Sequence, residues 1–289
     1  MHMKVLIVHS NNSNRIAPFI AEQIDALRQL DVDIQIFGIK GKGIRGYLKN
    51  RKLLLQHIHT FQPDIIHAHY GLSGLLANLQ RKVPVLTTYH GSDINDKGIF
   101  RISKLSIRLS NHNIFVSQKN INKAKVKKNF SLIPCGVDTS VFYLQDKELC
   151  RQAMHLSEDK RYILFAGAFA NPVKNASLAL HAVAKLKNTE LIELNGYTRE
   201  AVACLMNAVD ACLLTSHSEG SPQFIKEAMS CNCPIVSVDV GDVKELIDDV
   251  KYCYITEYDT QDIAEKLTLV LANDVRTDGG NKIAKMNLD

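Results

Sequence analysis

Short apolar segments alternate with amphipathic helical segments along the whole chain, and this alternation occurs twice. Strands separated by helices imply parallel sheets that are covered by helices on both faces. The chain is therefore expected to have an α/β fold made of two Rossmann-like, doubly wound parallel-sheet domains. The expected strands are residues 4–8, 33–37, 64–69, 83–89, 113–117 and 131–133 in the first half and 162–166, 191–194, 211–215, 234–238 and 252–255 in the second.

The length of 289 residues suits two domains better than one. The hydrophobic periodicity is lost over residues 140–158, so we place the boundary there, with a first domain of 1–145 and a second of 146–289. Ligands of open parallel sheets bind at the carboxyl ends of the strands. We therefore expect the functional site at these strand ends, in a cleft between the two domains.

Composition excludes several classes of protein. With 46% hydrophobic and 22% charged residues the chain is typical of a globular protein with a core, and no apolar run reaches the roughly 18 residues of a membrane span. The N-terminal apolar stretch is too short for a secretory signal. The seven scattered cysteines are then expected to be reduced thiols. These features predict a cytoplasmic location.

Charge is distributed unevenly between the two halves. Residues 1–145 carry 20 Lys and Arg against 8 Asp and Glu, a net charge of +12, whereas residues 146–289 carry 15 against 22, a net charge of −7. The basic half should face something anionic, such as a membrane surface or a phosphorylated substrate. Because Trp is absent and few aromatic residues lie near the basic runs, no nucleic-acid partner is predicted.

Residues 41–46 match the dinucleotide-binding pattern G-x-G-x-x-G. The match follows the second expected strand, whereas that pattern belongs after the first, so we do not assign a dinucleotide site to it. The segment is also basic. It is either a solvated loop or a contact to an anionic acceptor or to acidic lipid headgroups at the inner membrane face. The basic residues that would make this contact are Lys40, Lys42, Arg45 and Arg51.

Residues 216–247 hold the strongest functional signal. The expected strand 211–215 ends in a polar loop, and Glu219 then precedes a helix that contains Glu227. Pro222 suits the first helical turn, where free backbone amides favour an anion, and Gly220 permits close approach of the backbone. The two carboxylates are predicted to bracket a diphosphate.

This pattern resembles the retaining glycosyltransferases of the family-4, "group 1" type, which have the GT-B fold. The similarity rests on E-x7-E, the following EAM and the strand C-x-P-I-V-S, and it extends over nearly the whole chain. The other segments that resemble the family, in its order, are residues 64–74, 87–93, 114–118, 133–142, 164–175, 207–216 and 236–247. The chain is most similar to short members found in bacterial surface-polysaccharide clusters.

The resemblance implies a role for each matching position. Glu227 would hold the ribose hydroxyls of a nucleotide-sugar donor, and Glu219 would lie against the transferring sugar. Lys174 would neutralise the leaving diphosphate, and His90 would face the reacting sugar from the first domain. The loop at Tyr197 would lie against the base. The remaining donor-binding positions are Gly167, Gly220, Ser221 and Pro222.

The implied reaction is transfer of a hexose to a saccharide or lipid-linked saccharide, with retention at the anomeric carbon and with the leaving phosphate taking the acceptor proton. Such enzymes use no cofactor and generally no metal. The resemblance further implies polysaccharide biosynthesis, with association at the periphery of the membrane left open.

Four features depart from the family pattern. Ala168 stands where most relatives have an arginine, and residues 10–13 replace the usual glycine pair after the first strand. The second domain is abbreviated, and its final helix is short or truncated. These departures leave two alternatives open: a sugar-nucleotide epimerase of the same architecture, or a non-catalytic nucleotide-sugar binder.

No metal site is predicted. We expect His67 and His69 to point to opposite faces of one strand, and we expect His57 and His59 to be poorly spaced on a helix for a shared ion. Cysteines 231 and 233 are not followed by a second pair, so small buried residues are expected there rather than zinc ligands.

Overall fold

The computed structural model describes residues 2–273 and 275–289. The chain divides into two compact units, Met1–Pro134 and Cys135–Asp289. The second unit thus begins earlier than residue 146, where the sequence placed the boundary. The reason is that Val137 and Phe142 are buried in the second unit's core.

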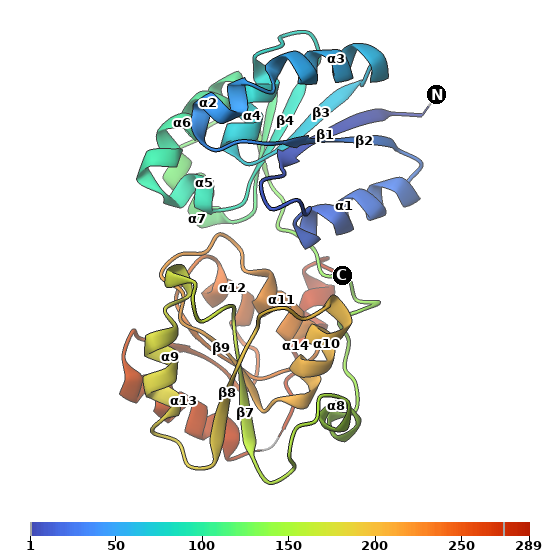
Figure 1. The fold of residues 1–289 in the computed structure, drawn as a ribbon. Helices are drawn as coiled ribbons and strands as arrows, with labels where there is room; N and C mark the ends of the chain where they lie inside the picture. Colours follow the sequence, from blue (N-terminus) through green and yellow to red (C-terminus); the bar gives the residue numbers. More distant parts are fainter. Residues whose placement is uncertain (1, 274) are drawn as a thin grey trace. The chain divides into compact units, whose positions relative to one another are not determined.

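The first unit is built on a six-stranded sheet in the order β2-β1-β3-β4-β5-β6, in which every neighbouring pair is parallel (Figure 1). Its strands are β1 Lys4–Ser10, β2 Asp33–Ile39, β3 Ile65–His69, β4 Val85–Tyr89, β5 His112–Phe115 and β6 Phe130–Leu132. Its helices are α1 Pro18–Gln29, α2 Gly43–Leu48, α3 Arg51–Phe61, α4 Gly71–Asn78, α5 Ser92–Asn95, α6 Lys97–Leu109 and α7 Gln118–Ala124.

Strand β1 shows why both faces of this sheet are covered. Successive side chains of a strand point to opposite faces. Val5 and Ile7 are buried against Ile20 and Ile24 of α1, whereas Leu6 and Val8 belong to a second cluster. That second cluster includes Leu54 and Ile58 of α3. The central strand is therefore apolar at consecutive positions, as expected of a parallel sheet.

The second unit has a five-stranded parallel sheet in the order β11-β10-β9-β7-β8. Its strands are β7 Arg161–Phe165, β8 Thr189–Glu193, β9 Ala211–Leu214, β10 Ile235–Val238 and β11 Cys253–Thr256. Its helices are α8 Lys147–Ala153, the 3-10 turn η1 Pro172–Lys174, α9 Ala176–Val183, α10 Arg199–Ala208, α11 Gln223–Ser230, α12 Val243–Ile247, α13 Thr260–Leu271 and α14 Gly279–Lys285. Helices α9 and α13 share one apolar cluster with the sheet, whereas α10, α11, α12 and α14 share another.

The predicted architecture is confirmed: each unit is a Rossmann-like parallel sheet between layers of helices. Each expected strand is present, and the ends differ by no more than two residues from those expected. Within the described parts of the chain, no helix combines the length and the apolarity that crossing a membrane requires.

Candidate functional site in the second unit, with a histidine cluster in the first

The carboxyl ends of the neighbouring strands β7 and β9 are tied together by hydrogen bonds. After β9, the Thr215 hydroxyl donates to the backbone carbonyls of Lys174 and Asn175 at 2.9 and 3.0 Å. The backbone N–H of His217 donates to the carbonyl of Val173 at 2.9 Å. Turn η1, which follows β7, is thereby fixed beside the loop that contains Glu219.

An ion pair lies at this junction. Lys174 Nζ is 2.8 Å from Glu219 Oε1, and 22% and 16% of the two side chains are exposed, so the pair is shielded but reachable. Gly167 adopts a φ of +150°, and a Cβ there would lie 3.1 Å from Lys174 side-chain carbons. A glycine at this position lets the lysine lie against the backbone after β7.

Helix α11 begins directly after Glu219, Gly220 and Ser221. Its N-cap is Pro222, one position before the first helical turn, and no side chain caps the helix. Gly220 is packed tightly, because a Cβ at Gly241 would lie 2.8 Å from its carbonyl oxygen. An N-terminus without a side-chain cap keeps amide groups for an anion.

Ser221 adds a buried hydroxyl beside this N-terminus. Its Oγ has no hydrogen-bond partner among the described residues. Burial raises the pKa of Asp242 to about 6. The N-terminus of α11 is thus lined by polar groups that the fold itself leaves incompletely paired.

Glu227 lies further along α11 and is 5% exposed. Arg199 Nη1 lies 2.5 Å from Glu227 Oε1, and the Arg199 guanidinium carbon is 4.4 Å from the Phe142 ring centroid. Arg199 opens α10 immediately after the loop that carries Tyr197, whose side chain is 42% exposed. The structure therefore brings Glu227 to the loop expected to contact the base.

Sequence analysis missed Arg199. The one sequence feature that could have indicated Arg199 is its position at the start of the helix that follows the Tyr197 loop. The sequence departure at Ala168 removes one expected cation. Lys174 forms an ion pair with Glu219, and Arg199 forms one with Glu227.

In the first unit, Asp93 fixes the position of His90. The Asp93 carboxylate accepts hydrogen bonds from the backbone N–H groups of His90, Gly91 and Gly71, each at 3.1 Å. These bonds join the loop after β4 to the start of α4. Burial raises the pKa of Asp93 to about 7, although the three N–H donors oppose the rise.

Four imidazoles gather where β1, β3 and β4 end: His9, His67, His69 and His90. The expectation that His67 and His69 point to opposite faces is wrong, because their ring centroids are only 4.4 Å apart. Residues two apart on a strand share a face. His69 Nδ1 in turn lies 3.0 Å from His90 Nε2.

This cluster is not arranged as a metal centre. Within residues 2–273 and 275–289, no group of three or more His, Cys, Asp or Glu side chains is placed to hold an ion. Cys231 and Cys233 are fully buried, and burial raises the pKa of the Cys231 thiol. Both lie in the apolar cluster of α11 and β10.

The glycines of residues 41–46 have a packing role. A Cβ at Gly41 would lie 2.9 Å from the Gly46 Cα, and Gly41 exchanges two backbone hydrogen bonds with the Asn12 amide. The basic side chains around them are exposed, but they lie on and beside α2 and α3 rather than in a continuous loop: Lys40, Lys42, Arg45 and Arg51.

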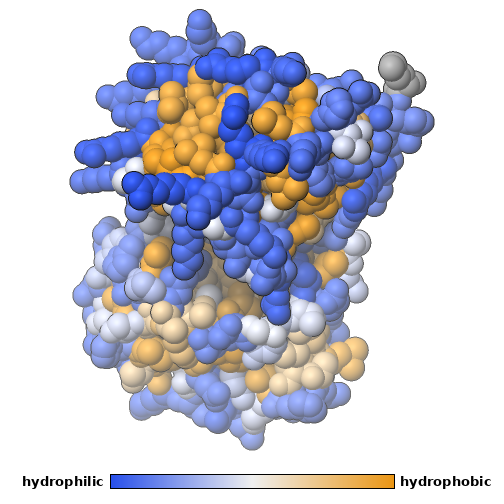
Figure 2. Space-filling model, turned by 45° about the horizontal axis from the view of Figure 1, so that its top comes forward, coloured by the Kyte–Doolittle hydropathy of each residue, from blue (hydrophilic) through white to orange (hydrophobic). Residues whose placement is uncertain are grey.

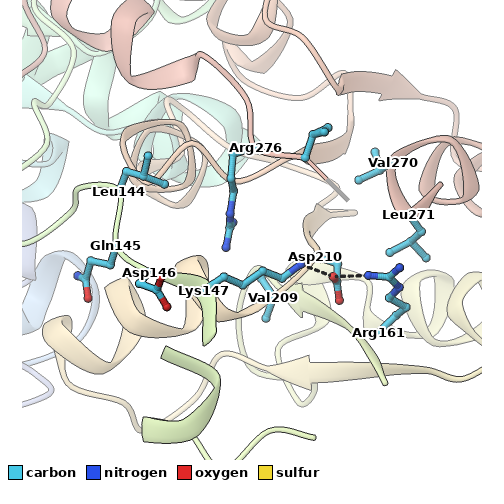
Figure 3. Close-up of a pocket in the computed structure, with 11 residues that line it drawn as sticks. Leu144, Gln145, Asp146, Lys147, Arg161, Val209, Asp210, Val270, Leu271 and Arg276 are labelled. Carbon is cyan, nitrogen blue, oxygen red and sulfur yellow. Dashed lines mark hydrogen bonds and ion pairs between the residues drawn. The ribbon is translucent and has the colours of Figure 1, made fainter. Parts of the chain in front are cut away.

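A separate pocket of about 460 Å³ lies at the amino ends of β7 and β9 (Figure 3). Lys147 and Arg161 reach the Asp210 carboxylate from two sides, at 2.8 and 3.3 Å. Arg151 adds a third ion pair at 2.9 Å. This edge is opposite to the one that carries Glu219, and its carboxylate is already neutralised by cations. We therefore assign the Asp210 cluster to stability.

Comparison with known families follows the division into two units. Residues 5–141 match the model for Glycosyltransferase Family 4, and residues 185–273 match the model for Glycosyl transferases group 1. Each of the two models therefore matches less than half of the chain, one in its first part and one in its second. Both models describe glycosyltransferases, which agrees with the glycosyltransferase part of the resemblance that the sequence motifs indicated.

Two curated relatives are transferases. The chain is 26% identical over 237 residues to the putative teichuronic acid biosynthesis glycosyltransferase TuaC of Bacillus subtilis, covering 71% of this chain and 61% of TuaC. It is 23% identical over 236 residues to a D-inositol 3-phosphate glycosyltransferase of Mycobacterium marinum, covering 64% of this chain and 50% of that protein. The chain thus spans about half to three-fifths of these relatives.

Solved structures show the same fold. Sucrose-phosphate synthase from Thermosynechococcus elongatus superposes with a TM-score of 0.84 at 16% identity, covering 99% of this chain and 94% of that one. Anabaena HepE, solved in complex with UDP-glucose, superposes with a TM-score of 0.76 at 17% identity, covering 98% and 94%. The predicted GT-B fold class is thereby confirmed.

Proposed function

We propose that the chain transfers a hexose from a nucleotide-sugar donor to a saccharide or lipid-linked saccharide, with retention of anomeric configuration. The observation that carries this proposal is the Lys174–Glu219 ion pair beside the uncapped N-terminus of α11. A cation and free amides at one place suit a diphosphate that must gain negative charge as it leaves.

The reaction requires one bond to form and one to break at the anomeric carbon. The acceptor hydroxyl oxygen attacks this carbon from the face that the diphosphate leaves, the bond to the phosphate oxygen breaks, and the acceptor proton passes to that oxygen. Lys174 stabilises the leaving group. Glu219, which holds the lysine in place before a donor binds, lies against the transferring sugar.

The rest of the donor binds along α11. Glu227 accepts hydrogen bonds from the ribose hydroxyls, and the Arg199 guanidinium orients its carboxylate. The loop at Tyr197 lies against the base, and the amides of Gly220 and Ser221 contact phosphate. HepE was solved with UDP-glucose, which makes UDP-glucose the first donor to test. In the first unit, His90 faces the sugar.

The acceptor is proposed from the name of TuaC, a putative teichuronic acid biosynthesis glycosyltransferase, and from the charge of the first half. A role in surface polysaccharide synthesis would place the protein in the cytoplasm, at the inner face of the membrane. Exposed apolar side chains accompany the exposed basic ones there: Ile44, Leu48 and Leu53. On the face shown in Figure 2, hydrophobic side chains form a patch in the first unit, surrounded by hydrophilic ones.

Transfer is proposed to need no metal, because Lys174 and the α11 amides supply the positive potential at the diphosphate. A non-catalytic nucleotide-sugar binder is the second candidate, and Ala168 in place of the expected arginine is the observation that favours it. The epimerase alternative has no such support, since both domain models describe glycosyltransferases.

Donor binding tests the proposal. Unfolding temperatures are measured with UDP, GDP, CMP, ADP and their sugar conjugates, UDP-glucose first, on the wild type and on Glu227→Gln. A donor at 100 times its Kd should add about 2.7 kcal/mol of stability. We expect one nucleotide to stabilise the wild type and to lose its effect in Glu227→Gln. The control is Glu265→Gln, an exposed position on α13.

Retention of the effect in Glu227→Gln would contradict the assigned ribose site. No stabilisation by any nucleotide would contradict the proposed function as a whole. Binding without turnover would favour the non-catalytic alternative.

A further inference from the structure

The His69–His90 hydrogen bond joins a fully buried ring to the loop after β4. His69 Nδ1 lies 3.0 Å from His90 Nε2, and the two rings lie edge to edge in nearly the same plane, with centroids 5.3 Å apart and an interplanar angle of 19°. His69 is 1% exposed. Water therefore cannot reach the His69 end of this hydrogen bond and replace it.

His69 is neutral. Burial lowers its pKa well below the ordinary value, and any charge on it would also be opposed by its neighbours His67, His90 and His9. A neutral imidazole carries a single proton, so one ring nitrogen donates and the other accepts. The position of that proton decides what His90 can do.

The surroundings of His69 place this proton on Nδ1. Its Nε2 is buried and has no hydrogen-bond partner among the described residues. A proton on Nε2 would be a buried N–H without an acceptor, whereas a proton on Nδ1 leaves only a lone pair unpaired at Nε2, and orphaned buried N–H groups are the rarer of the two in folded proteins. A proton on Nδ1 is donated instead to His90 Nε2, which must then present its lone pair.

We propose that His69 is a positioning residue that holds His90 as the neutral tautomer protonated at Nδ1. His90 then acts as a hydrogen-bond donor to an oxygen of the bound sugar and not as a base toward it. The statement about the sugar rests on the proposed function, whereas the tautomer follows from the first unit alone.

Further contacts fix the pair in this geometry. His67 Nε2 forms a 2.7 Å hydrogen bond with the Thr88 hydroxyl, so the ring that packs against His69 is itself held. The backbone of His90 is held by Asp93. Phe19 and Tyr70 lie against the His90 ring at centroid distances of 4.6 and 4.7 Å. Both the ring and the backbone of His90 are therefore restrained.

This assignment agrees with the proton balance of the proposed transfer. The acceptor proton goes to the leaving phosphate, so no base from the first unit is needed. A hydrogen-bond donor at His90 would instead withdraw electron density from a sugar oxygen or fix its orientation. His90 would thus act by orientation and not by proton removal.

Nitrogen NMR of the free protein tests the tautomer directly. The chain has 11 histidines, and long-range proton–nitrogen spectra of protein labelled in the histidine rings distinguish protonated from unprotonated ring nitrogens. At pH 8, the His90 signals, assigned by their loss in His90→Gln, should show a protonated Nδ1 and an unprotonated Nε2.

Substitutions at His69 then separate positioning from mere packing. His69→Leu should shift His90 toward the tautomer protonated at Nε2, because the donor is lost. His69→Asn should restore the Nδ1 tautomer, because the asparagine amide nitrogen branches from Cγ as Nδ1 does. His181→Asn, in α9 of the second unit, is the control. A wild-type His90 protonated at Nε2, or a pattern unchanged in His69→Leu, would overturn the proposal.

Activity provides an independent arm with UDP-glucose as the probe. His69→Leu should lower kcat for UDP-glucose cleavage about tenfold at nearly constant KM, but should cause no further loss in a His90→Ala background. Additive losses would contradict action through His90. Absence of any UDP-glucose cleavage would count against the proposed function with this donor, while the NMR result would still decide the tautomer.

Discussion

At the scale of single residues, the site is a set of opposite charges held together before any ligand binds. Glu219 is paired with Lys174, and Glu227 with Arg199. Each pair places a cation against a shielded carboxylate. In the proposed complex, contacts of the donor with Lys174 and Glu227 would replace part of the Lys174–Glu219 and Arg199–Glu227 contacts, so no charge would be left unpaired.

Lys174 should matter for rate far more than for stability. Lys174→Gln keeps a polar side chain of similar length but removes the charge, so kcat for transfer should fall by about 10²–10³-fold. Because the pair is partly exposed, the free energy of unfolding should change by no more than about 1 kcal/mol. Urea unfolding and initial rates on the same preparations check both statements. Equal rates in the two proteins would remove Lys174 from the proposed mechanism.

Asp93 should make stability depend on pH. Its pKa is raised by burial to about 7 from an ordinary 3.8, so the folded state binds a proton that the unfolded state has released between these values. The Asp93 contribution to stability is therefore fully present below about pH 4 and is lost as pH rises through 7.

The test compares unfolding free energies of the wild type and Asp93→Asn from pH 4 to pH 8. The wild type should lose stability relative to the variant as pH rises, by a few kcal/mol at most. Asp93→Asn also alters the backbone hydrogen bonds, which lowers the unfolding free energy by an amount that does not depend on pH. This constant loss leaves unchanged the slope of the free-energy difference with pH. A difference independent of pH would show that Asp93 is ionised throughout the range.

Sequence spacing predicted some of these residues but not others. Glu219 and Glu227 lie in one segment with a local motif, so their pairing with a helix start could be anticipated. Arg199 and Asp93 act through contacts to residues distant in sequence or to backbone N–H groups, and neither has a local pattern. Strand geometry places residues two apart on the same face, so the prediction that His67 and His69 point to opposite faces was wrong.

At the scale of elements, Asp210 joins α8, β7 and β9 at the edge of the sheet opposite the site. Its side chain is 4% exposed and contacts Lys147, Arg151 and Arg161, and it also accepts the backbone N–H of Tyr162 at 2.7 Å. Several cations around one buried carboxylate fix helix α8 on the second sheet. The residues before 146 join the second unit instead through Val137 and Phe142, which are buried in its core.

Loss of the Asp210 charge should destabilise the second unit. Asp210→Asn leaves the buried Arg151 and the partly exposed Lys147 and Arg161 without their partner, which should cost about 3–5 kcal/mol. Glu190→Gln, which breaks the exposed Lys160–Glu190 pair, should cost less than about 1 kcal/mol. Both are measured by urea unfolding, and donor affinity should be unchanged in each. An Asp210→Asn cost as small as that of the control would contradict the assignment of this cluster to stability.

Strand and helix positions were predictable because the spacing of apolar residues along the sequence indicates which side chains are buried. In β1, consecutive apolar residues correctly indicated a strand covered on both faces. The start of the second unit was not predictable in the same way. Residues 135–145 have no regular period, and only their packing, with Phe142 fully buried, assigns them to the second core.

At the scale of the whole molecule, the two halves differ most clearly in charge, +12 against −7. The basic half also carries exposed apolar side chains on α2 and α3. Basic and apolar groups together suit an anionic membrane surface, where each Lys or Arg contributes about 1 kcal/mol.

Vesicles rich in phosphatidylserine should therefore bind the protein at low salt. Simultaneous K40E, K42E, R45E and R51E should weaken binding by at least about 100-fold. The control reverses four exposed basic residues elsewhere in the first unit, K82E, R101E, K127E and K128E, and so has the same net charge. Sedimentation with vesicles measures both. Equal binding by the two variants would show that overall charge, and not this segment, is responsible.

The stereochemistry of transfer tests the central claim most directly. UDP-glucose, whose sugar is α-linked, is incubated with the protein and with methanol as a surrogate acceptor, and the methyl glucoside is identified by proton NMR. Unlike free glucose, the methyl glucoside does not interconvert between anomers. Retaining transfer predicts the α-glucoside from the wild type and none from Lys174→Gln within the same time. A β-glucoside would contradict the account.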